Sequence, residues 1–245
     1  VRSFRLQTGA YFSVLRSHSQ GGARPRTTVC SRWHMSRVEQ LTERTLGHYS
    51  ARAVQFWEGT KDHDVSQNRE ALLRHLPSGE RLRLLDVGCG PGRDVKYFVD
   101  LGHDVTGLDG CKEFVDMCQK LVPTATTVVQ DIHALDLPPQ EFHGVFANAV
   151  LFHVKRTELT RVLGEIAASL RPNGVLFVSN PRSMHGEDME KEGDDFDRRY
   201  GHYQTLQNWR IVCQSVGLVE LEHYYRPPGQ PIENQPWLAS VWRRP

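Results

Sequence analysis

The 245-residue chain has no apolar run close to the ~20 residues that a membrane-spanning helix requires. It also lacks C-x-x-C pairs, Cys/His clusters with zinc-binding spacing, and internal repeats. Its five cysteines are an odd number and follow no secretory signal, so we expect free thiols in a reducing compartment. These absences argue against a membrane protein, a disulfide scaffold and a zinc-finger protein.

Net charge is nearly absent too, because 30 Lys and Arg balance 29 Asp and Glu. The balance hides two unlike parts of the chain. Residues 1–37 contain seven Arg, no Lys and no acidic residue, whereas the remainder carries 23 basic and 29 acidic residues, a net charge of −6. Nucleic acids favour a basic protein face, so the acidic body argues against DNA or RNA as a partner.

The first segment, residues 1–37, is rich in Ser as well as Arg. This composition is typical of a mitochondrial transit peptide and predicts a mitochondrial location. The alternatives are a disordered tail, or sequence upstream of a translation start at Met35, in which case we expect a cytoplasmic protein.

From residue 82 onward, short apolar runs typical of strands alternate with helical patterns. The predicted strands cover residues 82–87, 103–109, 126–131, 144–149, 175–179, 219–225 and 237–242. Earlier, residues 38–49 and 65–76 have the apolar spacing of helices, and residues 56–64 between them are predicted to be a polar loop. The alternation predicts an α/β fold with a parallel sheet covered on both faces, and the last two strands, with no helix between them, predict an antiparallel edge.

The strongest motif is the loop after the first predicted strand, Asp86-Val87-Gly88-Cys89-Gly90-Pro91-Gly92. Glycines let the backbone turn sharply and approach a ligand, and the helix that follows offers free N–H groups. The third glycine, Gly92, does not occupy the position of the third glycine in the G-x-G-x-x-G loop of dinucleotide-binding proteins. Asp109 ends the second strand 19 residues after Gly90, where a carboxylate can accept both hydroxyls of a ribose. The alternatives are a tight turn without a ligand and, for Asp109, a helix N-cap.

With these residues the sequence resembles the class I S-adenosylmethionine-dependent methyltransferases, in particular the small-molecule type called type 11 or type 25, over roughly residues 49–245. The resemblance implies a single Rossmann-like domain with a mostly parallel seven-stranded sheet, an antiparallel edge strand and helices on both faces. It also implies lid helices over residues 38–80 and a methyltransferase domain over residues 81–245, with a charged insertion at about 184–203.

The resemblance implies S-adenosylmethionine as the cofactor, with S-adenosylhomocysteine as its product. The residues implied to bind it are Asp86, Gly88, Cys89, Gly90, Gly92, Asp109, Gly110, Asp131, Ile132 and Asn148. The glycine loop is implied to wrap the methionine part, Asp109 to bind the ribose, and Asp131 with Ile132 to hold the adenine. Asp131 as a turn residue and Cys89 as inert packing stay open as alternatives.

The candidates for the substrate side follow other strand ends or precede the sheet. They are Trp57, His63, Arg182, Tyr200, Tyr203 and Arg226. His153 follows the fourth strand, where a neutral imidazole can take a proton from a hydroxyl or an amine, although a structural histidine is an equal alternative. Arg226 is expected either near an anionic substrate group or as a cap of the last hairpin. A metal site at Asp62-His63-Asp64 is an alternative interpretation of that run, but we expect no metal there.

The implied activity is transfer of a methyl group to a small-molecule acceptor by direct displacement, with no nucleic acid or membrane as partner. One alternative is a relative that binds S-adenosylmethionine without catalysis. A less favoured one is an NAD(P)-dependent oxidoreductase. The sequence leaves open the identity of the acceptor, the atom that is methylated and the oligomeric state.

Overall fold

The computed structural model describes residues 35–194 and 196–245, so residues 1–34 of the predicted leader lie outside the described residues. The helices are α1 (Arg37–Ser50), α2 (Ala53–Thr60), α3 (Ser66–Leu73), α4 (Arg93–Asp100), α5 (Lys112–Leu121), α6 (Leu159–Ser169) and α7 (Leu206–Ser215). The strands are β1 (Arg83–Val87), β2 (Asp104–Asp109), β3 (Thr126–Val129), β4 (Phe142–Asn148), β5 (Leu170–Pro181), β6 (Met189–Lys191), β7 (Gly201–Tyr203), β8 (Val219–Arg226) and β9 (Trp237–Arg243). Three short 3-10 turns cover Ile132–Ala134, Leu151–His153 and Ile232–Asn234.

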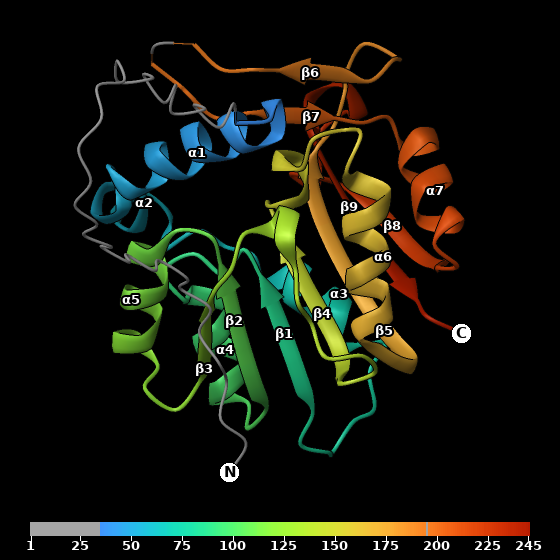
Figure 1. Ribbon diagram of the computed structural model, residues 1–245. Helices are drawn as coiled ribbons and strands as arrows, with labels where there is room; N and C mark the ends of the chain where they lie inside the picture. The colour runs from blue at the N-terminus through green and yellow to red at the C-terminus, as the bar shows by residue number, and fades with distance from the viewer. Residues whose placement is uncertain (1–34, 195) are drawn as a thin grey trace, which may run out of the picture. The chain divides into compact units, whose positions relative to one another are not determined.

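Seven strands form one sheet in the order β3-β2-β1-β4-β5-β9-β8 (Figure 1). The first five strands of this order pair in parallel, whereas β9 runs antiparallel to both β5 and β8. All seven strands predicted from the sequence are present, and the antiparallel pair forms one edge. The expected α/β fold class is therefore confirmed.

Both faces of the sheet are covered by helices, which explains why a central strand such as β5 contains a run of buried apolar residues, Val175-Leu176-Phe177-Val178. Neighbouring residues of a strand point to opposite faces, so Leu84 and Leu85 belong to two separate apolar clusters. Helices α3, α4 and α5 contribute to the cluster of Leu84, for example through Phe98. Helices α6 and α7 contribute Ile166 and Trp209 to the other. Each side chain of this size that is fully buried stabilises the fold by roughly 1.5–3 kcal/mol.

The N-terminal helices lie across the end of the sheet where the parallel strands terminate (Figure 1). Helix α1 begins with a capping box, in which the Ser36 hydroxyl accepts from the Glu39 amide and the Glu39 carboxylate accepts from the Ser36 amide. The prediction of a polar loop over residues 56–64 was wrong for its first part, because Phe56–Thr60 belongs to α2. The physical reason is tertiary packing, since Phe56 contacts the rings of Tyr49 and Phe114.

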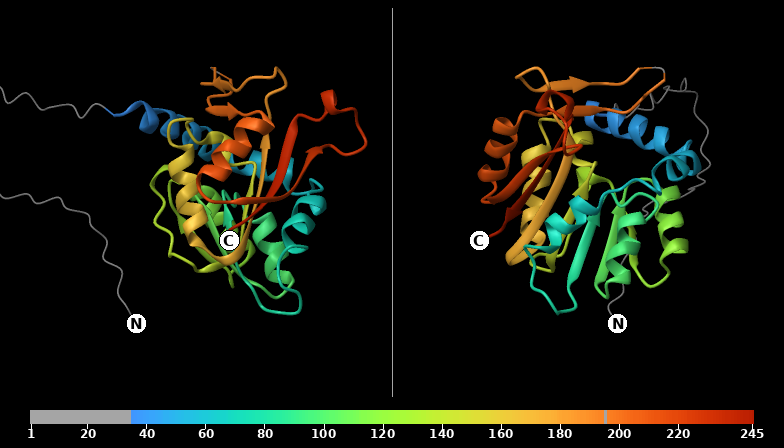
Figure 2. Two further views of the ribbon diagram at one scale, coloured as in Figure 1. Left: turned by 90° about the vertical axis from the view of Figure 1, so that its right-hand side faces the viewer. Right: turned by 180° about the vertical axis from the view of Figure 1, so that it is seen from behind.

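The charged insertion contains a small two-stranded sheet, β6 paired antiparallel with β7, that the sequence did not predict. It lies at the same end of the molecule as α1 (Figure 1). The segment between β8 and β9 extends away from the sheet as a long loop (Figure 2). In the part of the chain that the structure describes, no helix is long and apolar enough to cross a membrane.

Candidate functional site

The glycine loop connects β1 to α4 and has a backbone that other residues adopt only with strain. Gly88, Gly90 and Gly92 have φ angles of 70°, 54° and 98°. A Cβ atom at Gly88 would lie 2.4 Å from Cγ2 of Val150, and one at Gly92 would lie 2.7 Å from Sγ of Cys118. The loop is therefore pressed against neighbouring elements where a side chain would clash.

A cavity of about 630 Å³ lies above this loop, bounded by α1, α2 and the ends of the parallel strands. Its volume is within the ~300–1,000 Å³ typical of sites for small ligands. The predicted site residues that line it are Trp57, His63, Gly88, Cys89, Gly90, Asp109, Gly110, Asp131, Ile132, Asn148, His153 and Arg226. Residues predicted from separate strand ends thus meet around one cavity.

Asp109 joins the ends of β1 and β2 at this cavity. Its carboxylate accepts from the backbone N–H of Gly90 at 3.0 Å and from that of Cys111 at 2.8 Å. Burial raises the pKa of Asp109 to about 6, although the backbone hydrogen bonds oppose that shift. At neutral pH the carboxylate is therefore ionised and can accept further hydrogen bonds from a ligand.

Asp131 lies at the next strand end, after β3. Its Oδ1 accepts from the backbone N–H of His133 at 2.9 Å and lies 3.2 Å from the ring Nδ1 of the same residue. Burial acts to raise the pKa of Asp131, but the hydrogen bonds from His133 outweigh it and hold that pKa below its usual value. Thr42 of α1 contacts the His133 ring at 3.1 Å, which closes the cavity on this side.

His153 is fixed on both sides of its ring. Nδ1 lies 2.6 Å from the carbonyl oxygen of Tyr200, so it must carry the proton and donate. Nε2 lies 2.8 Å from the hydroxyl of Tyr49 and therefore accepts from it. Burial lowers the pKa of His153 to about 4, so the imidazole is neutral at physiological pH.

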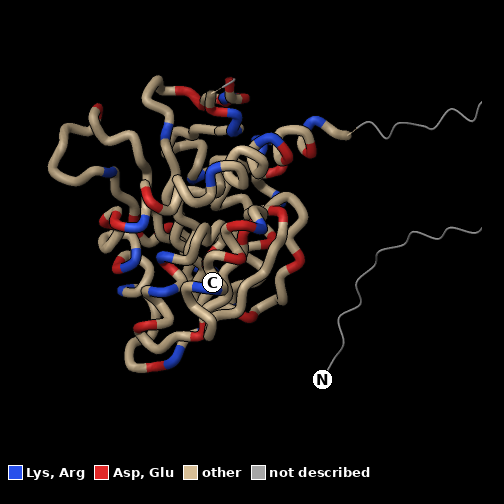
Figure 3. Tube along the Cα trace, turned by 90° about the vertical axis from the view of Figure 1, so that its left-hand side faces the viewer, with Lys and Arg blue, Asp and Glu red and all other residues tan. Residues whose placement is uncertain are grey.

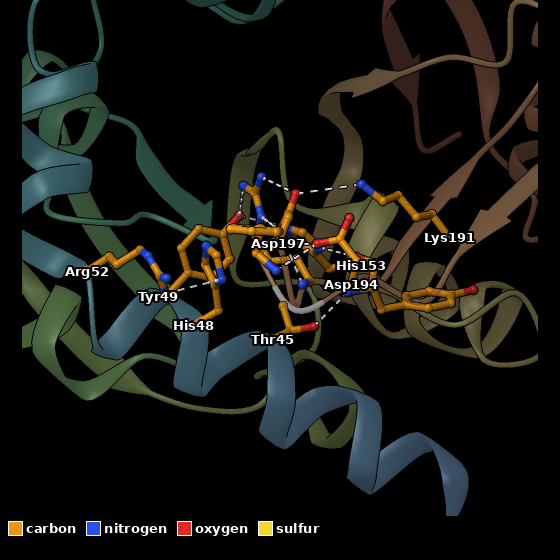
Figure 4. A network of polar contacts seen from close by, with 11 residues as sticks. Thr45, His48, Tyr49, Arg52, His153, Lys191, Asp194 and Asp197 are labelled. Carbon is orange, nitrogen blue, oxygen red and sulfur yellow. Dashed lines mark hydrogen bonds and ion pairs between the residues drawn. The ribbon is translucent and has the colours of Figure 1, made fainter.

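Tyr49 connects this histidine to a charged network drawn in Figure 4. The Arg199 guanidinium donates to the Tyr49 hydroxyl at 3.2 Å and holds Asp197 through two bonds of 2.7 and 2.8 Å. Burial raises the pKa of Tyr49, so its hydroxyl keeps its proton at neutral pH. Tyr49 and Arg199 both line the cavity and were not predicted as site residues.

Asn148 is held from behind by a buried relay. Asn68 of α3, which is fully buried, donates to the Asn148 side-chain oxygen at 3.0 Å and accepts from the Tyr224 hydroxyl at 3.1 Å. The next strand places Ser179 beside Asn148, and the buried Ser179 hydroxyl has no partner in the described part of the chain. This hydroxyl lines the cavity and can bond to a ligand there.

Five predicted site residues lie outside the lining of the cavity: Asp86, Gly92, Arg182, Tyr200 and Tyr203. Asp86 is buried beneath the glycine loop, and burial raises its pKa well above the usual value. Gly92 caps α4 and packs on Cys118. We expect neither residue to contact a ligand in the cavity directly.

The side chains of Arg182, Tyr200 and Tyr203 contact other parts of the protein, and the sequence did not indicate these contacts. The Arg182 guanidinium lies 4.5 Å from the centre of the Tyr225 ring and donates to the backbone of the β8–β9 loop. Tyr200 orients His153 through its backbone carbonyl, while its hydroxyl donates to Glu190 at 2.9 Å. The ring of Tyr203 packs near Phe152, with centroids 6.2 Å apart.

The cavity has no cluster typical of a metal centre. Across residues 35–194 and 196–245, no group of three or more His, Cys, Asp or Glu is arranged to hold a metal ion. Of the run at residues 62–64, only His63 and Asp64 line the cavity.

Comparison with known proteins agrees with this geometry. Residues 85–178 match the family model of a methyltransferase domain. The malonyl-[acyl-carrier protein] O-methyltransferase of Enterobacter lignolyticus is 32% identical over 118 residues, 47% of this chain and 46% of that protein. A ubiquinone biosynthesis O-methyltransferase of Rhodopseudomonas palustris is 33% identical over 157 residues, 55% of this chain and 60% of that protein. The chain spans about half the length of the curated relatives it matches.

Solved structures share the fold. The 1,6-didemethyltoxoflavin-N1-methyltransferase of Burkholderia thailandensis, solved with 1,6-didemethyltoxoflavin and S-adenosylhomocysteine, superposes with a TM-score of 0.71. The alignment covers 86% of this chain and 91% of that one, at 21% identity. This likeness confirms the predicted sheet with its antiparallel edge.

Proposed function

We propose that this chain is a class I S-adenosylmethionine-dependent methyltransferase and that it transfers a methyl group from S-adenosylmethionine to a small-molecule acceptor by direct displacement. The observation that carries the proposal is the cavity itself. It brings the glycine loop, Asp109 and Asp131 together along three neighbouring strand ends, and places the Tyr49–His153 pair in the same space.

The lining of the cavity fits the cofactor. The glycine loop would receive the methionine part, and an added Cβ at Gly90 would meet nothing nearer than Phe56 at 3.8 Å, so the missing side chain leaves room for it. Asp109 would accept the ribose hydroxyls, and Asp131 would lie beside the adenine. Gln130 has a buried side-chain oxygen with no partner in the described part of the chain, which the amino group of adenine would satisfy.

When bound, S-adenosylmethionine supplies a sulfonium methyl group, an electrophile that already carries its leaving group. The protein must therefore align the acceptor, exclude water and remove a proton where the acceptor has one. Helices α1 and α2 contribute the wall that separates the cavity from solvent, through Leu46, Tyr49 and Phe56.

The proton of the acceptor would move through Tyr49 and not directly to His153. The lone pair of His153 Nε2 already accepts from the Tyr49 hydroxyl, so an acceptor cannot reach it without displacing that bond. In the proposed step the acceptor proton passes to Oη of Tyr49 while the Tyr49 proton passes to Nε2 of His153. The Tyr200 carbonyl then holds the resulting imidazolium through Nδ1–H.

The small-molecule class is supported by enclosure and by charge. Residues of the N-terminal helices α1 and α2 form part of the wall of the cavity, whose volume of about 630 Å³ suits a cofactor together with a small acceptor. Acidic and basic positions are scattered among one another over the chain trace (Figure 3), and the sequence after residue 37 has a net charge of −6, which does not suit a polyanion.

The test is incubation of the protein with methyl-labelled S-adenosylmethionine and a metabolite extract. We expect label in one or a few small products, and none in the nucleic acid or protein fractions. A folded protein that binds S-adenosylhomocysteine but labels nothing in any extract would instead be the non-catalytic relative.

A further inference from the structure

The cavity wall contains three arginines, and two of them have acidic partners. Arg93 pairs with Asp94 at 2.7 Å and also donates to a backbone carbonyl of α2. Arg199 is held by Asp197 through two hydrogen bonds. Both guanidinium groups therefore have an anionic partner within the protein, although Arg93 shares Asp94 with Arg69.

Arg226 differs from both. It lies at the end of β8, and its Nη2 donates to the backbone oxygen of Asp64 at 2.9 Å. Within the described residues it forms no ion pair, and its buried Nε has no hydrogen-bond partner. Arg226 lines the cavity, so its guanidinium presents a positive charge there that no carboxylate of the described residues pairs with and that an anionic ligand can use.

The acidic side chain of Asp64, which senses the positive charge of Arg226, does not supply this anionic partner. Its carboxylate is exposed and accepts from the backbone N–H of Ser66 at 2.9 Å. That hydrogen bond is the main reason that the pKa of Asp64 lies below its usual value, and the positive charge of Arg226 adds to it. The two side chains sense each other through space but form no ion pair.

The surroundings of Arg226 are apolar on one side. Trp237 is its register partner across the β8–β9 pair, and both residues line the cavity together with Trp57 and Pro227. A guanidinium in a cavity that indole rings also line offers a planar fork for a carboxylate, with an apolar surface in the same space for the carbon skeleton attached to it.

We propose that Arg226 binds a carboxylate of the methyl acceptor, so that the substrate class is an organic acid with an apolar body. The inference rests on the methyltransferase function proposed above and names its acceptor. A second source of a carboxylate exists, namely the amino-acid end of S-adenosylmethionine.

Sheet order favours the acceptor. The residues that suit adenine, ribose and methionine follow β3, β2 and β1 in turn, whereas Arg226 follows β8, with β4, β5 and β9 in between. The acceptor must lie beyond the methyl group, and that is the direction in which β8 lies.

The test measures binding to protein saturated with S-adenosylhomocysteine. The probes are four carboxylates (butyrate, hexanoate, benzoate and cinnamate) and the primary amide of each, titrated by ligand-observed NMR. We expect acids to bind more tightly than their amides. Arg226→Gln should weaken acid binding about tenfold or more and leave the amides unchanged, since a charged hydrogen-bonded pair is lost.

Two further variants sharpen the result. Asp64→Asn keeps the oxygen that accepts from Ser66 but removes a negative charge near the site, so acids should bind more tightly. Arg74→Gln is the matched control, because Arg74 is a half-exposed arginine that faces Glu222 at 3.6 Å and does not line the cavity. It should change neither acid nor amide binding.

An absence of acid preference, or an acid preference that survives in Arg226→Gln, overturns the inference. Weaker binding of S-adenosylhomocysteine in Arg226→Gln with acid preference intact also overturns it, and assigns the guanidinium to the carboxylate of the cofactor. If the wild type does not bind S-adenosylhomocysteine at all, the proposed function is wrong. The acid and amide titrations can then be repeated without S-adenosylhomocysteine, so the inference about Arg226 is tested separately.

Discussion

Burial disfavours the charged form of Asp109 and raises its pKa to about 6, so the carboxylate is mostly ionised only at pH values above 6. Ribose hydroxyls donate to the ionised carboxylate, so affinity for S-adenosylhomocysteine should rise as pH increases from 5 to 7 and then level off. In Asp109→Asn the affinity should be about tenfold lower and no longer follow this pH curve. Calorimetric titration over this pH range checks both points, and a flat wild-type curve would show that Asp109 does not hold the ribose.

The Tyr49 hydroxyl is proposed to carry the acceptor proton to His153. Tyr49→Phe should therefore lower turnover by about a hundredfold, a typical contribution of general base catalysis, and leave affinity for S-adenosylhomocysteine unchanged. The control is Tyr97→Phe, because the ring of Tyr97 on α4 packs under the guanidinium of Arg69 on α3 and does not line the cavity. Equal turnover in wild type and Tyr49→Phe, with a substrate found by the labelling screen, would exclude the relay.

The imidazole of His153 gives a test that needs no substrate. Its pKa of about 4 means that the ring stays neutral from pH 8 to pH 5, with the proton on Nδ1. Long-range ¹H–¹⁵N NMR spectra should show this tautomer throughout that range. Titration near pH 6.5 would mean that the ring is solvated and not held by Tyr49 and Tyr200.

At the scale of elements, the glycine loop determines how closely β1, α4 and the segment after β4 approach each other. Gly88→Ala adds a Cβ only 2.4 Å from Val150, on a backbone with positive φ. Gly79→Ala has the same kind of backbone, with φ of 79°, but nothing within 4 Å of the new Cβ. Gly79→Ala should therefore cost only backbone strain, about 1–2 kcal/mol of the free energy of unfolding, and Gly88→Ala clearly more.

Urea denaturation of both variants measures these free energies. The matched pair separates backbone strain from steric overlap, since only Gly88 is crowded. Equal losses in the two variants would mean that Val150 moves aside without cost.

The elements themselves could be predicted where local pattern decides them. The central strands β1, β4 and β5 contain short apolar runs, because both faces of the sheet are buried there, whereas the edge strand β8 alternates apolar and polar residues. Helix α2 was missed, since Trp57-Glu58-Gly59 has no clear periodicity and the helix is held by ring contacts of Phe56. The β6–β7 pair was missed because each strand has only three residues. Those of β6 are exposed, and neither strand has the apolar pattern of a longer strand.

The site could be predicted only where the topology of the sheet brings residues together, and not where contacts join distant parts of the sequence. Asp109, Asp131 and the glycine loop follow consecutive strands, so a parallel sheet brings them together by topology alone. Tyr49 reaches His153 across 104 residues of sequence, and Arg199 reaches Tyr49 across 150. No local pattern indicates such contacts.

At the scale of the whole molecule, helix α1 and the charged insertion are linked directly above the cavity. The backbone N–H of Tyr200 donates to the buried hydroxyl of Thr45 at 3.0 Å, and Arg199 donates to Tyr49 (Figure 4). S-adenosylhomocysteine should therefore slow amide exchange in α1 and in residues 199–203 together. Hydrogen exchange measured by mass spectrometry checks this, with α7 as the unaffected reference.

A response confined to the glycine loop would show that the two segments are not coupled to the site. The reference helix is suitable because α7 contributes to the apolar cluster on one face of the sheet and does not line the cavity.

The uneven distribution of charge along the sequence predicts the cellular location of the protein. We propose that residues 1–37, with seven Arg and no acidic residue, direct the protein to mitochondria. A fluorescent protein fused behind these residues should accumulate there, and a fusion in which the seven Arg are replaced by Gln should not. Diffuse fluorescence of the unaltered fusion would contradict the proposal.

The central claim is that the cavity above the glycine loop binds the cofactor of a methyltransferase. The most direct measurement is calorimetric titration of S-adenosylhomocysteine into the purified, folded protein at pH 7.5. The account predicts one-to-one binding that is strongly weakened in Asp109→Asn and unchanged in the surface variant Arg74→Gln. No heat of binding to a wild-type sample with a cooperative unfolding transition would contradict it.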